Sequence, residues 1–202
     1  MDLKNYKNIV IIGTWNMAIF TPNWVNNYLI DGDENGEIPI DINFYGNRII
    51  SKIYNLGNYK IHISDEALAL IANNTEPETY ELLLDKAKSI LSFFPHTIVT
   101  SIGINFYIFD EIQKALPSMD IEDVNLITKV DRYTFFSKKR TGEDLKPIIQ
   151  VQVENHTDKQ LYNFNYSFNL KNISEAKEVL STGTFVKFRS ESENIITAIQ
   201  EI

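Results

Sequence analysis

Apolar residues at every second position mark most of the strands that this chain should form. Between residues 38 and 63, the runs 38–44 and 59–63 alternate Ile, Phe or Tyr with other residues, and a further apolar-rich run covers residues 49–54. The same alternation continues unbroken from Tyr162 to Leu170, where asparagine and serine separate the larger side chains. A period of two is typical of antiparallel strands with one buried and one solvent-facing side. Further strands are predicted at residues 9–20, with a break near Gly13, and at residues 68–71, 97–109, 132–137 and 148–154.

Helical spacing of apolar residues interrupts these strands. The clearest helix begins at Pro77, carries apolar residues at i, i+3 and i+4 spacing, and is closed by Pro95. Thr21 and Pro22 predict another helix start, since Thr is a good N-cap and Pro is favoured at the first helical position. Further helices are predicted over residues 110–116, 173–180 and 195–199, the last preceded by the capping-box pair Ser190 and Glu193.

The order of these elements repeats along the chain. Residues 15–20 and residues 104–109 share Asn, Ile and Phe at matching positions, and each stretch precedes a predicted capped helix, three strands and a further helix. We therefore expect an α+β fold of two β-α-β-β-β-α pseudo-repeats, residues 1–94 and 95–202, within one globular unit. The two halves should form one antiparallel sheet with the helices packed on one face. This layout resembles the duplicated fold of the TATA-box-binding proteins, although none of that family's motifs is present.

Composition and charge narrow the range of partners. The 202 residues are 44% hydrophobic and 23% charged, which is ordinary for a globular chain able to bury a core. The formal net charge of −8 repels the phosphate backbone of nucleic acid, so binding to nucleic acid is disfavoured. Abundant Ile and Asn, both encoded by A/T-rich codons, point to a bacterial or viral source.

The absence of cysteine excludes several kinds of chemistry. Disulfides, thiolate nucleophiles, cysteine-ligated zinc and iron–sulfur clusters cannot form in this chain. The apolar run near the N-terminus covers only residues 9–13, which is too short for a signal peptide or a membrane span. We therefore expect a cytoplasmic protein without membrane association.

Three local patterns suggest chemistry, and each has a simpler structural explanation. Residues 31–36 match the opening of an EF-hand loop, but Ile42 occupies the position of the bidentate ligand and a strand follows. The three histidines are too far apart along the chain to form a local metal motif. The basic cluster at residues 138–140 could bind single-stranded nucleic acid, but its position beside a turn favours a solvated hairpin tip. No metal and no cofactor is predicted.

A ligand site between the two halves would draw on four residues. Asn16 and Asn105 occupy matching positions in the two halves, and Trp15 lies beside Asn16. His96 lies at the junction of the long helix and the following strand, where it could act as an acid or base. Structural roles explain the same residues: hydrogen bonding of buried amides, and a histidine bonded to a backbone carbonyl.

The sequence favours a non-enzymatic function. It contains no phosphate-binding loop, no nucleophile elbow and no metalloprotease motif, so no catalytic residue is predicted. An antiparallel sheet leaves edges that can pair with another strand. We expect a protein-binding or assembly subunit of a multi-component system, with another protein or a second copy as its partner. The alternative is a small-ligand sensor or an enzyme with its site between the two halves.

Overall fold

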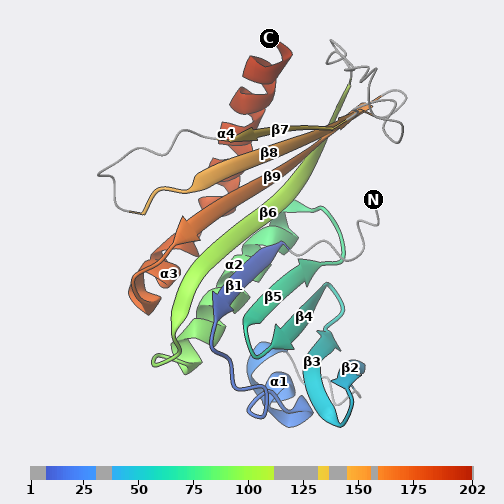
Figure 1. The fold of residues 1–202 in the computed structure, drawn as a ribbon, viewed down its shortest axis with the longest axis vertical. Coiled ribbons are helices and arrows are strands. Elements are labelled where there is room, and N and C mark those ends of the chain that lie inside the picture. Colours follow the sequence, from blue (N-terminus) through green and yellow to red (C-terminus); the bar gives the residue numbers. More distant parts are fainter. Residues whose placement is uncertain (1–7, 31–37, 112–131, 137–144, 156–158, 202) are drawn as a thin grey trace.

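The computed structural model describes residues 8–30, 38–111, 132–136, 145–155 and 159–201. Within these residues, one nine-stranded antiparallel sheet follows the order β2-β3-β4-β5-β1-β6-β9-β8-β7 (Figure 1). The strands are β1 (Ile9–Gly13), β2 (Ile40–Tyr45), β3 (Arg48–Asn55), β4 (Tyr59–Ser64), β5 (Ala67–Ala72), β6 (Val99–Glu111), β7 (Arg132–Phe136), β8 (Ile148–Asn155) and β9 (Lys159–Asn169). The helices are α1 (Pro22–Leu29), α2 (Pro77–Phe93), α3 (Ile173–Val179) and α4 (Thr184–Gln200). The predicted α+β class is therefore confirmed.

The pair β1–β6 lies at the centre of the sheet and joins its two groups of strands. Ile9 pairs with Ile104 and Ile11 with Ile102 across this antiparallel ladder. Strands β5 to β2 continue the sheet on one side of the pair, and β9, β8 and β7 continue it on the other (Figure 1).

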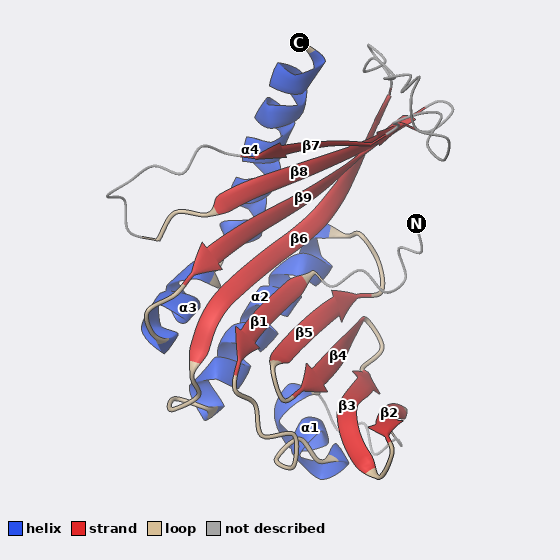
Figure 2. Ribbon diagram, viewed as in Figure 1, coloured by secondary structure: helices blue, strands red, loops and turns tan. Residues whose placement is uncertain are grey.

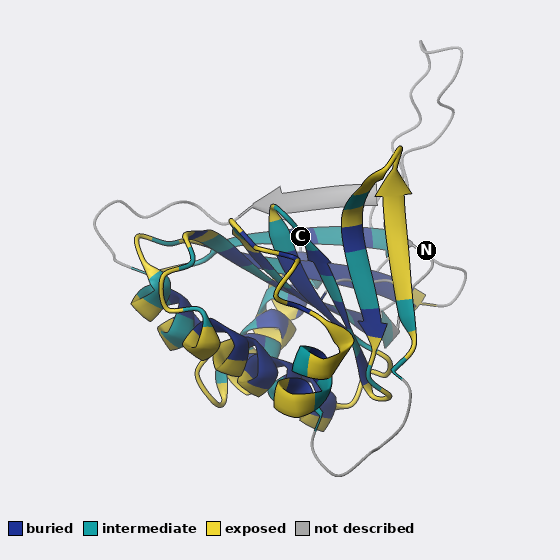
Figure 3. Ribbon diagram, turned by 90° about the horizontal axis from the view of Figure 1, so that it is seen from below, coloured by how far each residue is buried: buried dark blue, intermediate teal, exposed yellow. Residues whose placement is uncertain are grey.

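The helices cover one face of the sheet (Figure 2). Buried residues lie between the helix layer and the sheet, while exposed residues line the outer sides of the helices (Figure 3). Tyr80 of α2 stacks on Phe185 of α4 with a ring-centroid distance of 4.3 Å, and Phe185 meets Phe106 of β6 edge-on at 5.2 Å. We call the opposite side of the sheet the helix-free face, because no described helix covers it. None of the helices in the described residues is long and apolar enough to cross a membrane.

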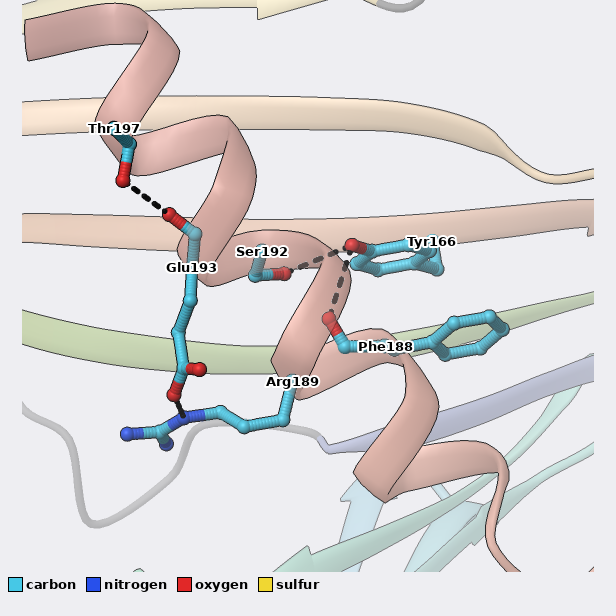
Figure 4. Close-up of polar contacts among 6 residues, drawn as sticks. All are labelled: Tyr166, Phe188, Arg189, Ser192, Glu193 and Thr197. Carbon is cyan, nitrogen blue, oxygen red and sulfur yellow. Dashed lines mark hydrogen bonds and ion pairs between the residues drawn. The ribbon is translucent and has the colours of Figure 1, made fainter.

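Helix α4 is fixed to the sheet by a buried tyrosine (Figure 4). The Tyr166 hydroxyl lies 2.8 Å from Ser192 Oγ and donates to the Phe188 carbonyl oxygen over 3.2 Å. The Tyr166 and Phe188 rings also stack, with centroids 4.3 Å apart. Ser192 has no exposed surface, so this contact supplies the hydrogen bond that its buried hydroxyl requires.

The start of α4 corrects one prediction. Helix α4 begins at Thr184, after Gly183 with φ of 83°, and not at Ser190. Ser190 and Glu193 are therefore interior helical residues and form no capping box. Glu193 instead pairs with Arg189 one turn earlier at 3.5 Å, and its carbonyl oxygen accepts from Thr197 (Figure 4).

The predicted first strand is shorter than expected. β1 ends at Gly13, where a Cβ atom would lie 2.3 Å from the Ile98 carbonyl oxygen, so only glycine allows this close approach. Residues 14–20 leave the sheet and form an irregular segment that ends at the predicted N-cap Thr21, whose hydroxyl accepts from Trp24 N. The segment is held by β3, because Lys52 Nζ donates to backbone oxygens of this segment over 2.8 and 3.1 Å.

Two further differences concern the predicted repeat. Four strands, β2 to β5, lie between α1 and α2, as the runs along residues 38–71 predict, whereas the predicted repeat unit has only three strands there. Asp110 lies within β6, which continues to Glu111, so it does not cap a helix there. The remainder of that predicted helix lies outside the described residues.

Candidate interaction surfaces

Three of the four predicted site residues lie near the end of the sheet where β1 finishes and β6 begins. Trp15 is buried, its Nε1 donates to the Ile11 carbonyl oxygen over 3.3 Å, and its ring meets Phe94 edge-on at 6.2 Å. Asn16 is exposed, and its Oδ1 accepts from Ala18 N over 3.0 Å. His96 is exposed in the turn between α2 and β6. These contacts support local structure: Trp15 fills the core and Asn16 stabilises a turn.

Asn105 lies at the opposite end of β1 from Asn16. Its backbone N–H donates to the Asn8 carbonyl oxygen over 2.6 Å, and Asn8 precedes β1, whereas Asn16 follows it. The Asn105 side chain accepts instead from Asn165 Nδ2 of β9 over 2.5 Å. The structure therefore does not bring Asn16 and Asn105 together.

Amide side chains form rows across the helix-free face that sequence reasoning did not identify. Asn105 pairs with Asn165, which pairs in turn with Gln150, so three amides lie side by side across β6, β9 and β8. The next row contains Asn163 and Gln152. The sequence does place these residues at the polar positions of alternating strands. Which of them lie side by side depends on the register between the strands, and one sequence does not give that register.

Asn163 is unusual within these rows. Only 6% of its surface is exposed, and neither Oδ1 nor Nδ2 has a hydrogen-bond partner within the described part of the chain. Its neighbours along β9, Tyr162 and Phe164, belong to the core on the helix side. Asn163 therefore points to the helix-free face.

The perturbed titratable groups that the structure resolves are tyrosines with structural roles. Burial raises the pKa of Tyr80 to about 12. Burial also raises the pKa of Tyr166, against the opposing effect of its hydrogen bond to Ser192. Such groups stay protonated at neutral pH, and the Tyr166 hydroxyl donates a hydrogen bond within the core. No group of three His, Asp or Glu side chains able to hold a metal occurs in the described ranges.

Strand β2 is the most exposed strand of the sheet for which burial is described. It has one neighbour, β3, within the described residues, and five of its six residues are exposed (Figure 3). Ile42 is 39% exposed, Phe44 60% and Tyr45 82%. The strand contains one charged residue, Asp41, and neither lysine nor proline, which commonly protect natural sheet edges.

The apolar residues of β2 point toward the helix-layer side of the sheet. Ile42 pairs with Lys52, whose side chain reaches the segment before α1 on that side. Phe44, two positions further on, lies on the same face. Asn43 points the other way and donates to Ser51 Oγ over 2.8 Å. The apolar side of the sheet therefore continues onto β2, where Ile42 and Phe44 are left exposed.

A second apolar surface lies where α1 meets the end of α2. Trp24 and Tyr28 of α1 have ring centroids 5.3 Å apart, and Phe93 of α2 lies 4.9 Å from Tyr28. Tyr28 and Phe93 are each about half exposed. Exposed aromatic groups are enriched at protein interfaces, so this cluster is a further candidate contact surface.

The residues of the remaining predicted patterns are only partly described. The EF-hand-like segment 31–36, the basic cluster 138–140 and His156 lie outside the described residues. His62 lies on β4, on the helix-free face opposite Ala69. No protein-family model, curated protein or solved structure matches the chain.

Proposed function

We propose that this protein is a non-enzymatic protein-binding or assembly subunit that accepts a partner strand at the edge of β2. The observation that carries the proposal is the exposure of β2, an outermost strand whose apolar residues continue the core-facing side of the sheet. Pairing of an added strand would satisfy backbone groups on the free side of β2, and its side chains would cover Ile42 and Phe44.

The area available fits an interaction surface. A large aromatic side chain can bury about 150–250 Å². Phe44 at 60% exposure therefore offers roughly 90–150 Å² to a partner, and the more exposed Tyr45 adds to it. The edge strand would provide backbone hydrogen bonds, and these side chains would provide the apolar contact.

The proposed architecture behind this function is a pair of pseudo-repeats, residues 1–94 and 95–202. Supporting it, β5-β4-β3 and β9-β8-β7 continue the sheet on the two sides of the β1–β6 pair in corresponding order. β2 has no counterpart beyond β7 in the described residues. On this proposal the two edges differ, and β2 is the edge specialised for a partner.

Co-purification with an edge variant tests the proposal. Phe44→Lys places a charge on the edge strand, as natural proteins do to prevent pairing. Val186→Lys on α4 is the matched control, because Val186 is 58% exposed and lies on a helix. The tagged wild-type chain should retain a protein in stoichiometric amount, or should associate with a second copy of itself at high concentration. Phe44→Lys should lose that partner and Val186→Lys should keep it, with both variants folded by circular dichroism. Retention by Phe44→Lys, or a wild-type chain without any partner, would contradict the proposal.

A small-ligand sensor or enzyme is the second candidate, favoured by the buried amide of Asn163, which has no hydrogen-bond partner among the described residues. A primary amide offers one acceptor and two donors, so it suits a ligand carrying an amide or similar planar polar group. Native mass spectrometry of the gently purified protein tests this function. The wild-type protein should carry one bound small molecule per chain, and Asn163→Leu should lose that molecule. A wild-type protein without any bound small molecule would exclude this function.

A further inference from the structure

We infer that the partner of β2 is β2 of a second copy of this chain, paired antiparallel about a twofold axis that passes through Ile42. This inference rests on the proposed function, since it names the occupant of the same edge. It follows from the direction of the backbone groups of β2 and from the side chains that a twofold operation would bring together.

The backbone hydrogen bonds of β2 determine which of its groups face away from β3, toward the free side on which no described strand lies. Asn55 N donates to the Pro39 carbonyl oxygen over 3.1 Å, so residue 39 directs its backbone toward β3. This direction alternates along an antiparallel strand. Ile40, Ile42 and Phe44 therefore present their N–H and C=O groups to the free edge. The register shift in this hairpin preserves the alternation, because its extra residue, Ile50, lies on β3.

A twofold axis through Ile42 uses all three of these residues. Ile42 would lie opposite its own copy, and Ile40 opposite Phe44 of the second copy, in two symmetric pairs. These are the residues with free backbone groups, so each opposed pair can exchange two hydrogen bonds. An axis through Asn43 would oppose only Ile42 with Phe44 and would leave Ile40 against the turn at Gly46.

Side-chain chemistry is complementary in the same register. Opposed residues of an antiparallel pair share a face. On the helix-layer side, the pairing would join only apolar residues: Ile40, Ile42 and Phe44. On the helix-free side, Asp41 would lie opposite Asn43 of the second copy, so a carboxylate would accept from an amide. The two Asp41 carboxylates would not oppose each other, which matters for a chain of net charge −8.

The size of this contact predicts a weak dimer. Six residues of strand span about 20 Å. The exposed part of Phe44 supplies roughly 90–150 Å² per copy. Counted over both copies and together with Ile42, this still remains well below the roughly 1,200 Å² that a stable interface buries in total. The dimer should therefore form reversibly, with a dimeric fraction that rises with protein concentration.

The absence of native cysteine allows a direct test by disulfide cross-linking of the full chain. Opposed residues of a hydrogen-bonded pair have Cα atoms about 5.5 Å apart, within the range that a disulfide spans. Ile42→Cys should therefore form a covalent dimer under mild oxidation. Asp41→Cys and Asn43→Cys should each stay monomeric alone and form a mixed disulfide when combined, since these residues oppose each other only across the axis.

Two outcomes would overturn the inference. One is an Ile42→Cys protein that stays monomeric after oxidation at high concentration. The other is an Asp41→Cys protein that dimerises as fast alone as when mixed with Asn43→Cys. Sedimentation velocity of the unmodified chain covers the case in which a cysteine variant fails to fold. The wild-type sedimentation coefficient should rise with concentration, and that of Phe44→Lys should not.

The same experiments separate this inference from the proposed function. If the chain stays monomeric but loses a different stoichiometric protein on Phe44→Lys substitution, β2 binds a partner other than itself. The self-pairing is then wrong and the proposed function stands. If no cross-link forms and no partner depends on Phe44, both are wrong.

Discussion

Replacement of Asn163 by leucine should make the protein more stable, although the residue lies in the interior of a central strand. Asn163 is 6% exposed, and neither atom of its amide has a hydrogen-bond partner in the described part of the structure. Leucine has a similar shape and carries no polar group, so Asn163→Leu removes the unpaired amide without creating a large cavity.

The expected magnitude follows from the penalty for burying unpaired polar groups. A buried donor or acceptor without a partner costs about 1–3 kcal/mol, and replacing it with an apolar group of the same shape recovers much of that penalty. We therefore expect Asn163→Leu to raise the free energy of unfolding by about 1–3 kcal/mol.

Asn165 provides a matched control on the same strand and the same face. Its Nδ2 donates to Asn105 Oδ1 over 2.5 Å, so Asn165→Leu removes an existing hydrogen bond. This control should lower the free energy of unfolding by about 1 kcal/mol. Urea denaturation followed by circular dichroism measures both variants, provided that the slopes of the transitions are equal.

The reasoning is refuted if Asn163→Leu is destabilised as much as Asn165→Leu. That result would show that the Asn163 amide is hydrogen-bonded in solution. A loss of stability confined to Asn163→Leu, together with a ligand that only the wild-type protein retains, would favour the second candidate function.

Three further predictions concern the core and can be checked by chemical or thermal unfolding. Tyr166→Phe should lower the free energy of unfolding by about 1–3 kcal/mol, because the buried Ser192 hydroxyl loses the contact that it makes at 2.8 Å. Gly13→Ala should lower the free energy of unfolding by at least about 1–3 kcal/mol, since the added Cβ would lie 2.3 Å from the Ile98 carbonyl oxygen. A variant with the melting temperature of the wild type would refute this. Burial raises the pKa of Tyr80 from 10.0 to about 12, so the unfolded chain ionises first and stability should fall between these pH values. The stability of Tyr80→Phe should fall less steeply over that pH range than the stability of the wild type. An equal fall in the two proteins would contradict the assignment.

The sequence predicted the elements that depend on local pattern. Alternation over residues 161–170 predicted β9, because one side of that strand contacts the core along its whole length. Thr21 and Pro77 correctly predicted the starts of α1 and α2, since capping chemistry acts within a single turn. The start of α4 was predicted wrongly, because the pair Ser190 and Glu193 matches a capping box without being at a helix end.

Features that depend on strand pairing could not be predicted from one sequence. Asn16 and Asn105 occupy matching positions in the two predicted pseudo-repeats. In the structure they lie at opposite ends of β1, because the chain leaves the sheet after Gly13. The edge position of β2 depends on the order of all the strands. The unpaired amide of Asn163 depends on which side chains from neighbouring strands lie beside it. A sequence pattern indicates that a residue faces away from the core, but not what lies opposite it.

Hydrogen–deuterium exchange of β2 tests the central claim, that this edge is the interaction surface, most directly. The backbone amides of Ile40, Ile42 and Phe44 face the free edge and should exchange rapidly in the dissociated protein. In the assembled protein, as obtained by gentle purification, the same amides should become protected when a strand pairs with them. The amides of the central strand β6 should stay protected in both states and provide the internal reference. Equal exchange of the β2 amides in the assembled and the dissociated protein would contradict the account.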